Sequence, residues 1–198
     1  MIEIAIATED ALSEAVLETL VQHSGRPVQI AARLRRQGFG YLKSRMASFH
    51  QMAQWRPVLV LTDLDQAHCA PLLLRDWLRQ PPAPNLLLRV AVREVEAWLL
   101  ADGEAFATFM GIDPGKVPTQ PETLPDPKQR LLNLVRQSRQ RDVKRDLLPA
   151  PGSRTIQGLG YNEQLIRFVR DHWRVDCAIA QAPSLARAWR RLQAWPTP

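Results

Sequence analysis

Residues 57–65 read Pro57-Val58-Leu59-Val60-Leu61-Thr62-Asp63-Leu64-Asp65, and no other segment of the chain is as informative about its fold. The unbroken apolar run from Val58 to Leu61 predicts a strand that is buried on both faces, as in the middle of a parallel sheet. Two aspartates follow the run. We therefore expect a hydrophobic strand that places carboxylates at its carboxyl end.

Strand and helix patterns alternate on both sides of this segment. Further strands are predicted at 2–7, 27–30 and 86–92, and helices at 10–21, 41–54, 72–78 and 94–109. Strands that alternate with helices favour parallel pairing with right-handed crossovers. The sequence thus predicts the α/β class, with a mostly parallel four-stranded sheet flanked by helices.

The pattern changes after residue 112. Five prolines between Pro114 and Pro127 indicate a connecting segment. Asp126-Pro127 is typical of a helix start, with a capping aspartate and proline at the first helical position. Helices are also expected at 162–173 and 184–195. We expect an α/β domain over 1–112 and, packed on it, a connector with a helical section over 113–198.

Charge is distributed unevenly along the chain. Residues 1–127 contain 12 Lys and Arg against 15 Asp and Glu, whereas residues 128–198 contain 14 against 5. An acidic half followed by a basic half suits a protein that holds a polyanion by its phosphates and presents acids to it. An Arg-rich solvated helical surface is the alternative explanation.

Carboxylates follow three of the four predicted strands. Glu9 and Asp10 come after the first, Asp63 and Asp65 after the third, and Glu94 and Glu96 after the fourth. The carboxyl ends of parallel strands form one edge of a sheet, so these acids are expected to gather there. Clustered carboxylates suit Mg²⁺ or Mn²⁺. Asp63 and Asp65, two residues apart, should point to the same side if the strand continues that far.

Each acid also has a structural explanation. Glu9 and Asp10 can satisfy a helix N-terminus, and Asp65 can be a turn or capping residue. Glu94 and Glu96 can be first-turn helix acids, one of them paired with Arg93 or Arg89. The tryptophans Trp173, Trp189 and Trp195 can stack on bases, although their helical spacing among apolar residues is more typical of core positions.

The chain resembles a TOPRIM-like family of bacterial proteins. The resemblance is carried by Glu9, by Asp63-Leu64-Asp65, by the nine residues from Glu94-Val95-Glu96 to Asp102, and by Asp126-Pro127-Lys128. It covers residues 1–134, with an echo at 182–185. That family is similar to the TOPRIM domains of overcoming-lysogenisation-defect (OLD) nucleases and of phage-defence effectors that work with ATPases.

The resemblance implies roles for individual residues. Glu9, Asp63 and Asp65 would be the main metal ligands, with Glu96 or Glu94 as a further acid, and Lys128 would lie near the scissile phosphate. Related sequences often have Glu-Gly-x-x-Glu after the first strand, whereas Asp10 and Ser13 stand here in place of the glycine and the second glutamate. The number of metal ions, one or two, stays open.

These features predict a Mg²⁺- or Mn²⁺-dependent nuclease acting on DNA or RNA. The resemblance further implies an effector that works with a separate ATPase in phage defence. A homo-oligomer is a further expectation. The basic residues expected to hold flanking phosphates are Arg136, Arg139, Arg141, Lys144 and Arg145. The alternatives are a non-catalytic subunit that binds nucleic acid or a partner protein, and a phosphoryl-transfer enzyme acting on nucleotides.

Several classes of protein are not indicated. Cys69 and Cys177 are far apart and match no disulfide framework or cysteine zinc site, which favours a reducing cytoplasm. No signal-peptide pattern and no apolar run of about 18–20 residues is present, so neither export nor a membrane association is expected. The phosphate-loop motif of P-loop ATPases is absent.

Overall fold

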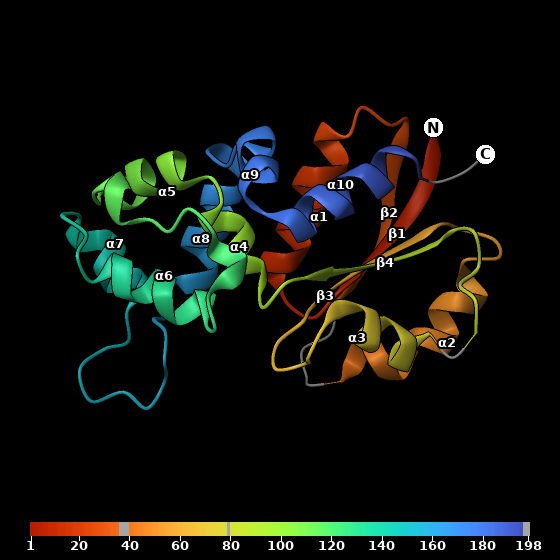
Figure 1. Ribbon diagram of the computed structural model, residues 1–198, viewed down its shortest axis with the longest axis horizontal. Coiled ribbons are helices and arrows are strands. Elements are labelled where there is room, and N and C mark those ends of the chain that lie inside the picture. Colours follow the sequence, from red (N-terminus) through yellow and green to blue (C-terminus); the bar gives the residue numbers. More distant parts are fainter. Residues whose placement is uncertain (36–39, 79, 196–198) are drawn as a thin grey trace. The chain divides into compact units, whose positions relative to one another are not determined.

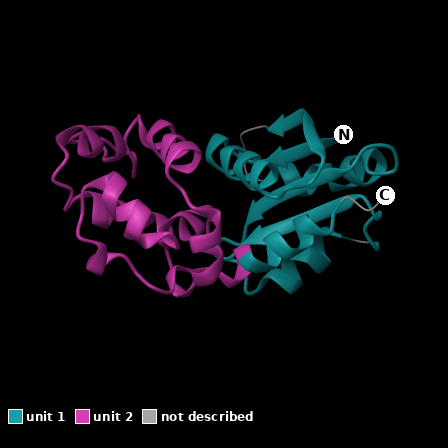
Figure 2. Ribbon diagram, turned by 90° about the horizontal axis from the view of Figure 1, so that it is seen from above, with its two compact units in different colours: residues 1–92, 186–198 teal, residues 93–185 magenta. Residues whose placement is uncertain are grey.

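The computed structural model describes residues 1–35, 40–78 and 80–195 of the chain (Figure 1). It forms two compact units: unit 1 consists of 1–92 and 186–198, and unit 2 of 93–185 (Figure 2). The sequence-based division at residue 112 partitions the chain differently, since the first unit ends at Val92 and the C-terminal residues return to it. None of the helices in the described ranges is long and apolar enough to span a bilayer.

Unit 1 is built on a four-stranded sheet in which all pairs are parallel. Its strands are β1 (Ile2–Thr8), β2 (Val28–Arg35), β3 (Val58–Asp63) and β4 (Leu86–Ala91), in the order β2-β1-β3-β4. This confirms the predicted α/β class. The second strand extends five residues beyond the predicted 27–30, because pairing with β1 continues to Arg35 opposite Thr8.

Helices cover both faces of this sheet. Figure 1 shows α1 (Ala11–His23) and α10 (Pro183–Gln193) on one side and α2 (Tyr41–Met52) and α3 (Ala70–Trp77) on the other. On the α2 side, Leu42 and Phe49 pack against Val58 and Val60 in one buried cluster. Burial of large apolar side chains of this kind stabilises a fold by about 1.5–3 kcal/mol each.

Unit 2 is helical. Its elements are α4 (Val95–Leu100), α5 (Gly103–Met110), the short 3-10 turns η1 (Pro114–Lys116) and η2 (Pro121–Thr123), α6 (Pro127–Val135), α7 (Arg141–Leu147), α8 (Tyr161–Asp171) and α9 (Val175–Gln181). All residues of α4 are buried, and Phe106 meets Phe168 edge to face at 5.6 Å between ring centres.

The predicted single helix over 94–109 is wrong, because the chain forms two helices there. The first ends at Leu100, and Asp102 caps the second, its carboxylate accepting a hydrogen bond from the Ala105 amide at 3.4 Å. The predicted start of a helix at Asp126-Pro127 is confirmed, with the Asp126 side chain accepting from the Gln129 amide at 2.7 Å.

Candidate functional site

A topological switch point lies between β1 and β3. From β1 the chain passes to β2 on one side of it, and then to β3 on the other side. From the carboxyl end of β3 the chain continues outward to β4, so the connections after β1 and after β3 leave in opposite directions, and open α/β sheets bind ligands at such a point. Glu9 follows β1 directly, and Asp63 is the last residue of β3.

Glu9 and its neighbour Asp10 have different roles. Asp10 caps α1, its carboxylate accepting a hydrogen bond from the Ser13 amide at 2.7 Å. Glu9 instead accepts a hydrogen bond from the Thr62 hydroxyl at 3.0 Å, across the β1–β3 pair. The helix-capping explanation thus holds for Asp10, whereas the Glu9 carboxylate is oriented by β3.

Asp63 and Asp65 do not share one extended strand. β3 ends at Asp63, and Asp65 has a left-handed backbone with φ of 47°, so the strand does not continue as far as the expected same-side arrangement of the two requires. The amide of Leu64 still donates to the Ala91 carbonyl at 2.9 Å, and the Ala67 amide donates to Leu64 at 3.0 Å, closing a turn. Asp65 is therefore a turn residue that follows the strand.

This turn brings the Asp65 charge within electrostatic range of Glu9. Burial raises the pKa of Glu9 above 4.5, the negative charges of Asp65 and Asp10 raise it further, and the hydrogen bond from Thr62 acts against them. Burial also raises the pKa of Asp65 above 3.8. Two partly desolvated carboxylates at a switch point form a site that a cation would stabilise.

The predicted acids divide between the two units. Glu9, Asp63 and Asp65 belong to unit 1, and Glu94 and Glu96 to unit 2. In the part of the chain that the structure describes, no group of three or more His, Cys, Asp or Glu side chains is arranged to hold a metal ion. Within unit 1, the candidate cation site is therefore described by Glu9, Asp65 and the Thr62 hydroxyl.

In unit 2, Glu94, Glu96 and Lys128 lie in one polar cluster. Glu94 is the residue before α4 and accepts a hydrogen bond from the Lys128 amide at 2.9 Å. Glu96, in the first turn of α4, is 6% exposed and accepts from the Tyr161 hydroxyl at 2.8 Å. The Lys128 ammonium lies 4.9 Å from the centre of the Tyr161 ring. Lys128 is therefore not simply a solvent-facing lysine.

Burial dominates the electrostatics of this cluster. The pKa of Glu96 is raised to about 7 in the balance of these effects: desolvation raises it most, Lys128 lowers it, Glu94 raises it and the Tyr161 hydrogen bond lowers it. The sequence analysis did not single out Tyr161, and no pattern around it marks the residue. It is 33 residues from Lys128 in the chain and reaches the cluster only because α8 packs in unit 2.

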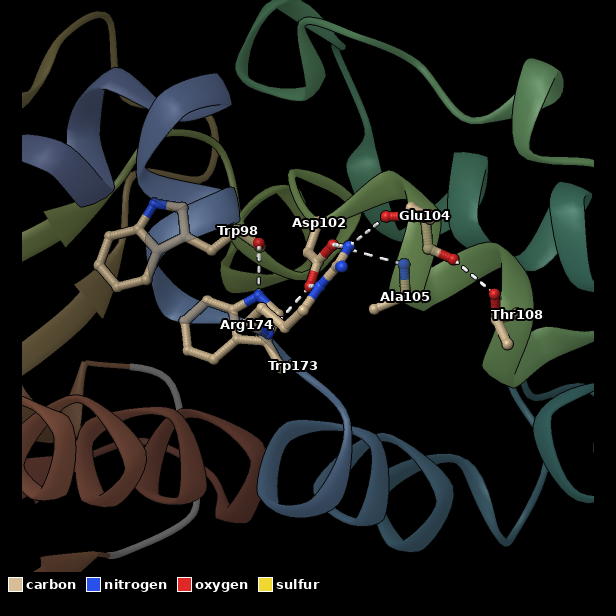
Figure 3. A network of polar contacts seen from close by, with 7 residues as sticks. All are labelled: Trp98, Asp102, Glu104, Ala105, Thr108, Trp173 and Arg174. Atoms are coloured by element: carbon tan, nitrogen blue, oxygen red, sulfur yellow. Dashed lines mark hydrogen bonds and ion pairs between the residues drawn. The ribbon is translucent and has the colours of Figure 1, made fainter.

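The segment from Glu94 to Asp102 also organises unit 2. Asp102, 2% exposed, accepts three hydrogen bonds from Arg174, at 2.9 Å from its amide, 3.0 Å from Nε and 2.7 Å from Nη2 (Figure 3). Trp173 Nε1 donates to the Trp98 carbonyl at 3.1 Å, as Figure 3 also shows. These contacts join α4 and α5 to the segment between α8 and α9.

Trp98 connects this segment to residues 182–185, the second part of the family resemblance. Its Nε1 donates to the Ser184 hydroxyl at 2.7 Å, and that hydroxyl donates to Glu122 at 2.6 Å. Trp98 is fully buried. Trp173 and Trp195 are also buried, which favours the core interpretation of these tryptophans over base stacking. Much of the resemblance in unit 2 therefore coincides with residues that stabilise its packing.

The predicted phosphate-binding residues lie in unit 2, from the end of α6 through α7. Arg136, Arg139 and Arg141 are exposed. Arg145, also exposed, forms ion pairs with Asp142 at 2.8 Å and Asp146 at 3.1 Å. Gly111 supports this region: its φ is +63°, and a side chain there would clash with Gln140 at 2.8 Å. Its carbonyl accepts from the Arg139 amide at 3.0 Å.

Comparisons of this chain with protein-family models, with curated proteins and with solved structures found no match in any of the three.

Proposed function

We propose that the chain is a nuclease that depends on Mg²⁺ or Mn²⁺ and hydrolyses phosphodiester bonds in DNA or RNA. One observation carries the proposal. At the switch point between β1 and β3, burial raises the pKa values of Glu9 and Asp65, and the negative charge of Asp65 raises that of Glu9 further. Ligands of open α/β sheets bind at such points, and desolvated acids there mark a candidate functional site.

The residues present fit a magnesium ion. Mg²⁺ usually keeps several waters and is held by one or two carboxylates together with phosphate oxygens of the substrate. Glu9 and Asp65 would supply the two carboxylates, with Asp63 beside them at the end of β3. When bound, the ion would supply charge neutralisation at the phosphate and activation of a water nucleophile.

Side chains of this chain contribute in three ways. The Thr62 hydroxyl orients the Glu9 carboxylate and favours its ionised form, the form that binds a cation. Lys128 would add positive charge near the scissile phosphate, the role implied by the family resemblance. Arg136, Arg139, Arg141, Lys144 and Arg145 would hold flanking phosphates by contacts that do not depend on sequence.

The proposal includes a setting for the activity. A separate ATPase subunit and a role in phage defence come from the family resemblance alone, and homo-oligomer formation is a further part of the proposal. A cytoplasmic location is in keeping with Cys69 and Cys177, both of which are free thiols.

The direct test incubates the purified chain with linear DNA, circular DNA and tRNA, with Mn²⁺, with Mg²⁺ and with EDTA. We expect cleavage that requires the metal and is reduced by about 10²-fold or more in Asp65→Asn and Asp63→Ala. Asp76→Asn is the matched control, because Asp76 is an exposed acid of unit 1 that pairs with Lys43 on the helix layer. Cleavage that persists in EDTA and in both variants would refute the proposal.

A second candidate is a non-catalytic subunit that binds nucleic acid. It is favoured by the finding that, among the described residues, no three metal-binding side chains are grouped together. The role of Asp10 as a helix cap also favours it, since that carboxylate is already in use. In that case oligonucleotide affinity should be the same with Mn²⁺ and with EDTA, and the charge-neutral changes at Asp63 and Asp65 should leave it unchanged.

A further inference from the structure

Three arginines converge within unit 1 on the side of the sheet that α10 covers. Leu86 and Leu88 of β4 belong to the apolar cluster on the α2 side, so alternation along the strand directs Arg89 to the opposite face. Arg187 and Arg191 are four residues apart on α10 and therefore share one helix face. Both lie close enough to Arg89 to repel its charge.

The cluster costs free energy as it stands. Arg89 is half-buried, and its Nε donates to the Leu88 carbonyl at 2.7 Å. Burial lowers the pKa of Arg89, and the charges of Arg191 and Arg187 lower it further. Like charges held together in a partly desolvated place are stabilised only when an anion joins them.

The protein itself supplies no such anion within the part that the structure describes. There, no carboxylate pairs with Arg89, Arg187 or Arg191. Residues 177–198 contain three arginines and no acid. The acids of α1 pair with β2 instead: Glu18 pairs with Arg33 at 2.6 Å and Glu14 with Arg35 at 3.7 Å.

We propose that Arg89, Arg187 and Arg191 form a binding site for phosphate groups of a nucleic-acid backbone. Guanidinium groups match phosphate oxygens in pairs of parallel hydrogen bonds, and several guanidinium groups together suit a ligand with repeated negative charges. β4 is hydrogen-bonded to β3, with Arg89 opposite Leu61 and Ala91 opposite Asp63. The site therefore belongs to the strand beside the one that carries the acids of the proposed nuclease centre.

The structure argues against a membrane surface as the ligand. A helix that binds at a bilayer surface inserts its apolar face among the lipids. The apolar side of this helix is already packed in unit 1: Ala188 is 5% exposed, Leu192 is 3% exposed, and Trp195 beyond the helix end is 5% exposed, while Ala186 and Trp189 are partly buried. Arg187 and Arg191 are exposed, so the helix presents positive charge to a partner.

The inference extends the proposed nuclease function but is tested apart from it. Binding of fluorescein-labelled single- and double-stranded oligodeoxynucleotides is measured by anisotropy in EDTA, where no cleavage is expected, over a series of salt concentrations. Arg187→Gln and Arg191→Gln should each weaken binding by about tenfold at low salt and lower the log–log salt slope by about one. Arg190→Gln is the matched control, because it removes the same charge from the same helix, and the charges that lower the pKa of Arg89 are those of Arg187 and Arg191.

Each outcome decides the matter. If Arg190→Gln lowers the oligonucleotide affinity as much as Arg187→Gln and Arg191→Gln do, binding depends only on diffuse positive charge, and the site is overturned. Absence of oligonucleotide binding by the unmodified protein in EDTA would also overturn it. Arginine-dependent cosedimentation with phosphatidylglycerol vesicles, without oligonucleotide binding, would also overturn it. The thermal midpoint of Arg187→Gln and Arg191→Gln should rise, since repulsion with Arg89 is removed, and a fall would mean that these arginines serve packing.

Discussion

The hydroxyl of Thr62 donates to Oε1 of Glu9 over 3.0 Å, from the next-to-last residue of β3 to the residue that follows β1. The bond joins two segments that are 53 residues apart and are neighbours only in the folded sheet. It orients one carboxylate at the switch point and partly offsets the burial that raises the pKa of that carboxyl.

Removing this hydroxyl should weaken cation binding. In Thr62→Val the Glu9 pKa should rise further, because the one contribution that lowers it is lost. We expect Mn²⁺ affinity, measured by calorimetry, to fall by about tenfold and the free energy of unfolding to fall by about 1 kcal/mol. Thr62→Ser keeps the donor and should restore the affinity. Equal affinities in the valine and serine variants would contradict this role for Thr62.

Neutralising the acids themselves should stabilise the protein while removing metal binding. Because the pKa values of Glu9 and Asp65 are raised on folding, the folded state binds more protons than the unfolded chain above about pH 4, and stability falls as pH increases through that window. Glu9→Gln and Asp65→Asn should therefore raise the free energy of unfolding at neutral pH by about 0.5 kcal/mol each, a figure reduced for their solvent exposure.

Thermal unfolding with and without Mn²⁺ checks this prediction. The ion should raise the melting temperature of the unmodified chain and leave that of the two variants unchanged, since a ligand stabilises only the state that binds it. Destabilisation of Glu9→Gln or Asp65→Asn at neutral pH would show that these carboxylates serve the fold.

The buried Glu96 should make stability depend on pH near neutrality. Its pKa is raised from 4.5 to about 7, so the stability present below pH 4.5 is lost as the pH rises toward 7. In Glu96→Gln this dependence should flatten, with a gain of roughly 1–3 kcal/mol above pH 7. Urea unfolding over a pH series measures it, and Glu163→Gln, at an exposed position in the first turn of α8, is the control.

The Asp102–Arg174 contact should be the most important ion pair in unit 2. Asp102→Ala removes three acceptor contacts from a buried position and a helix cap, and should lower the free energy of unfolding by about 2–3 kcal/mol. Glu104→Gln removes only the exposed contact to the same arginine at 2.9 Å and should cost less than about 0.5 kcal/mol. Urea unfolding that gives similar losses for both would contradict this.

The arginines near α7 should differ in their contribution to nucleic-acid binding. Arg139→Gln with Arg141→Gln should lower the log–log salt slope of oligonucleotide binding by about two. Arg145→Gln should lower it by much less, because Arg145 already pairs with Asp142 and Asp146. If Arg145→Gln lowers the log–log salt slope as much as the double variant does, the ion pairs of Arg145 open when the oligonucleotide binds.

Local sequence patterns predicted the sheet and its helices well. The apolar run at Val58–Leu61 forms β3, the alternating run at the N-terminus forms β1, and Asp126-Pro127 begins α6. These features depend on backbone preference and on which residues avoid water, and both can be recognised in a short stretch of sequence. Predictions failed where residues distant in sequence determine the local structure. At Asp102 one expected helix is divided into two, because the Asp102 carboxylate caps the second helix and also binds Arg174.

The candidate site shows the same division. From the sequence alone it followed that carboxylates come after strands of a parallel sheet, and hence that Glu9 and Asp63 lie at its carboxyl edge. The folded chain alone determines that the charge of Asp65, in a turn, acts on Glu9, that Tyr161 contacts Glu96, and that the charges of two arginines of α10 act on Arg89. The reason is physical: desolvation and charge–charge interaction act through space, and the groups that set them are tens of residues apart in the chain.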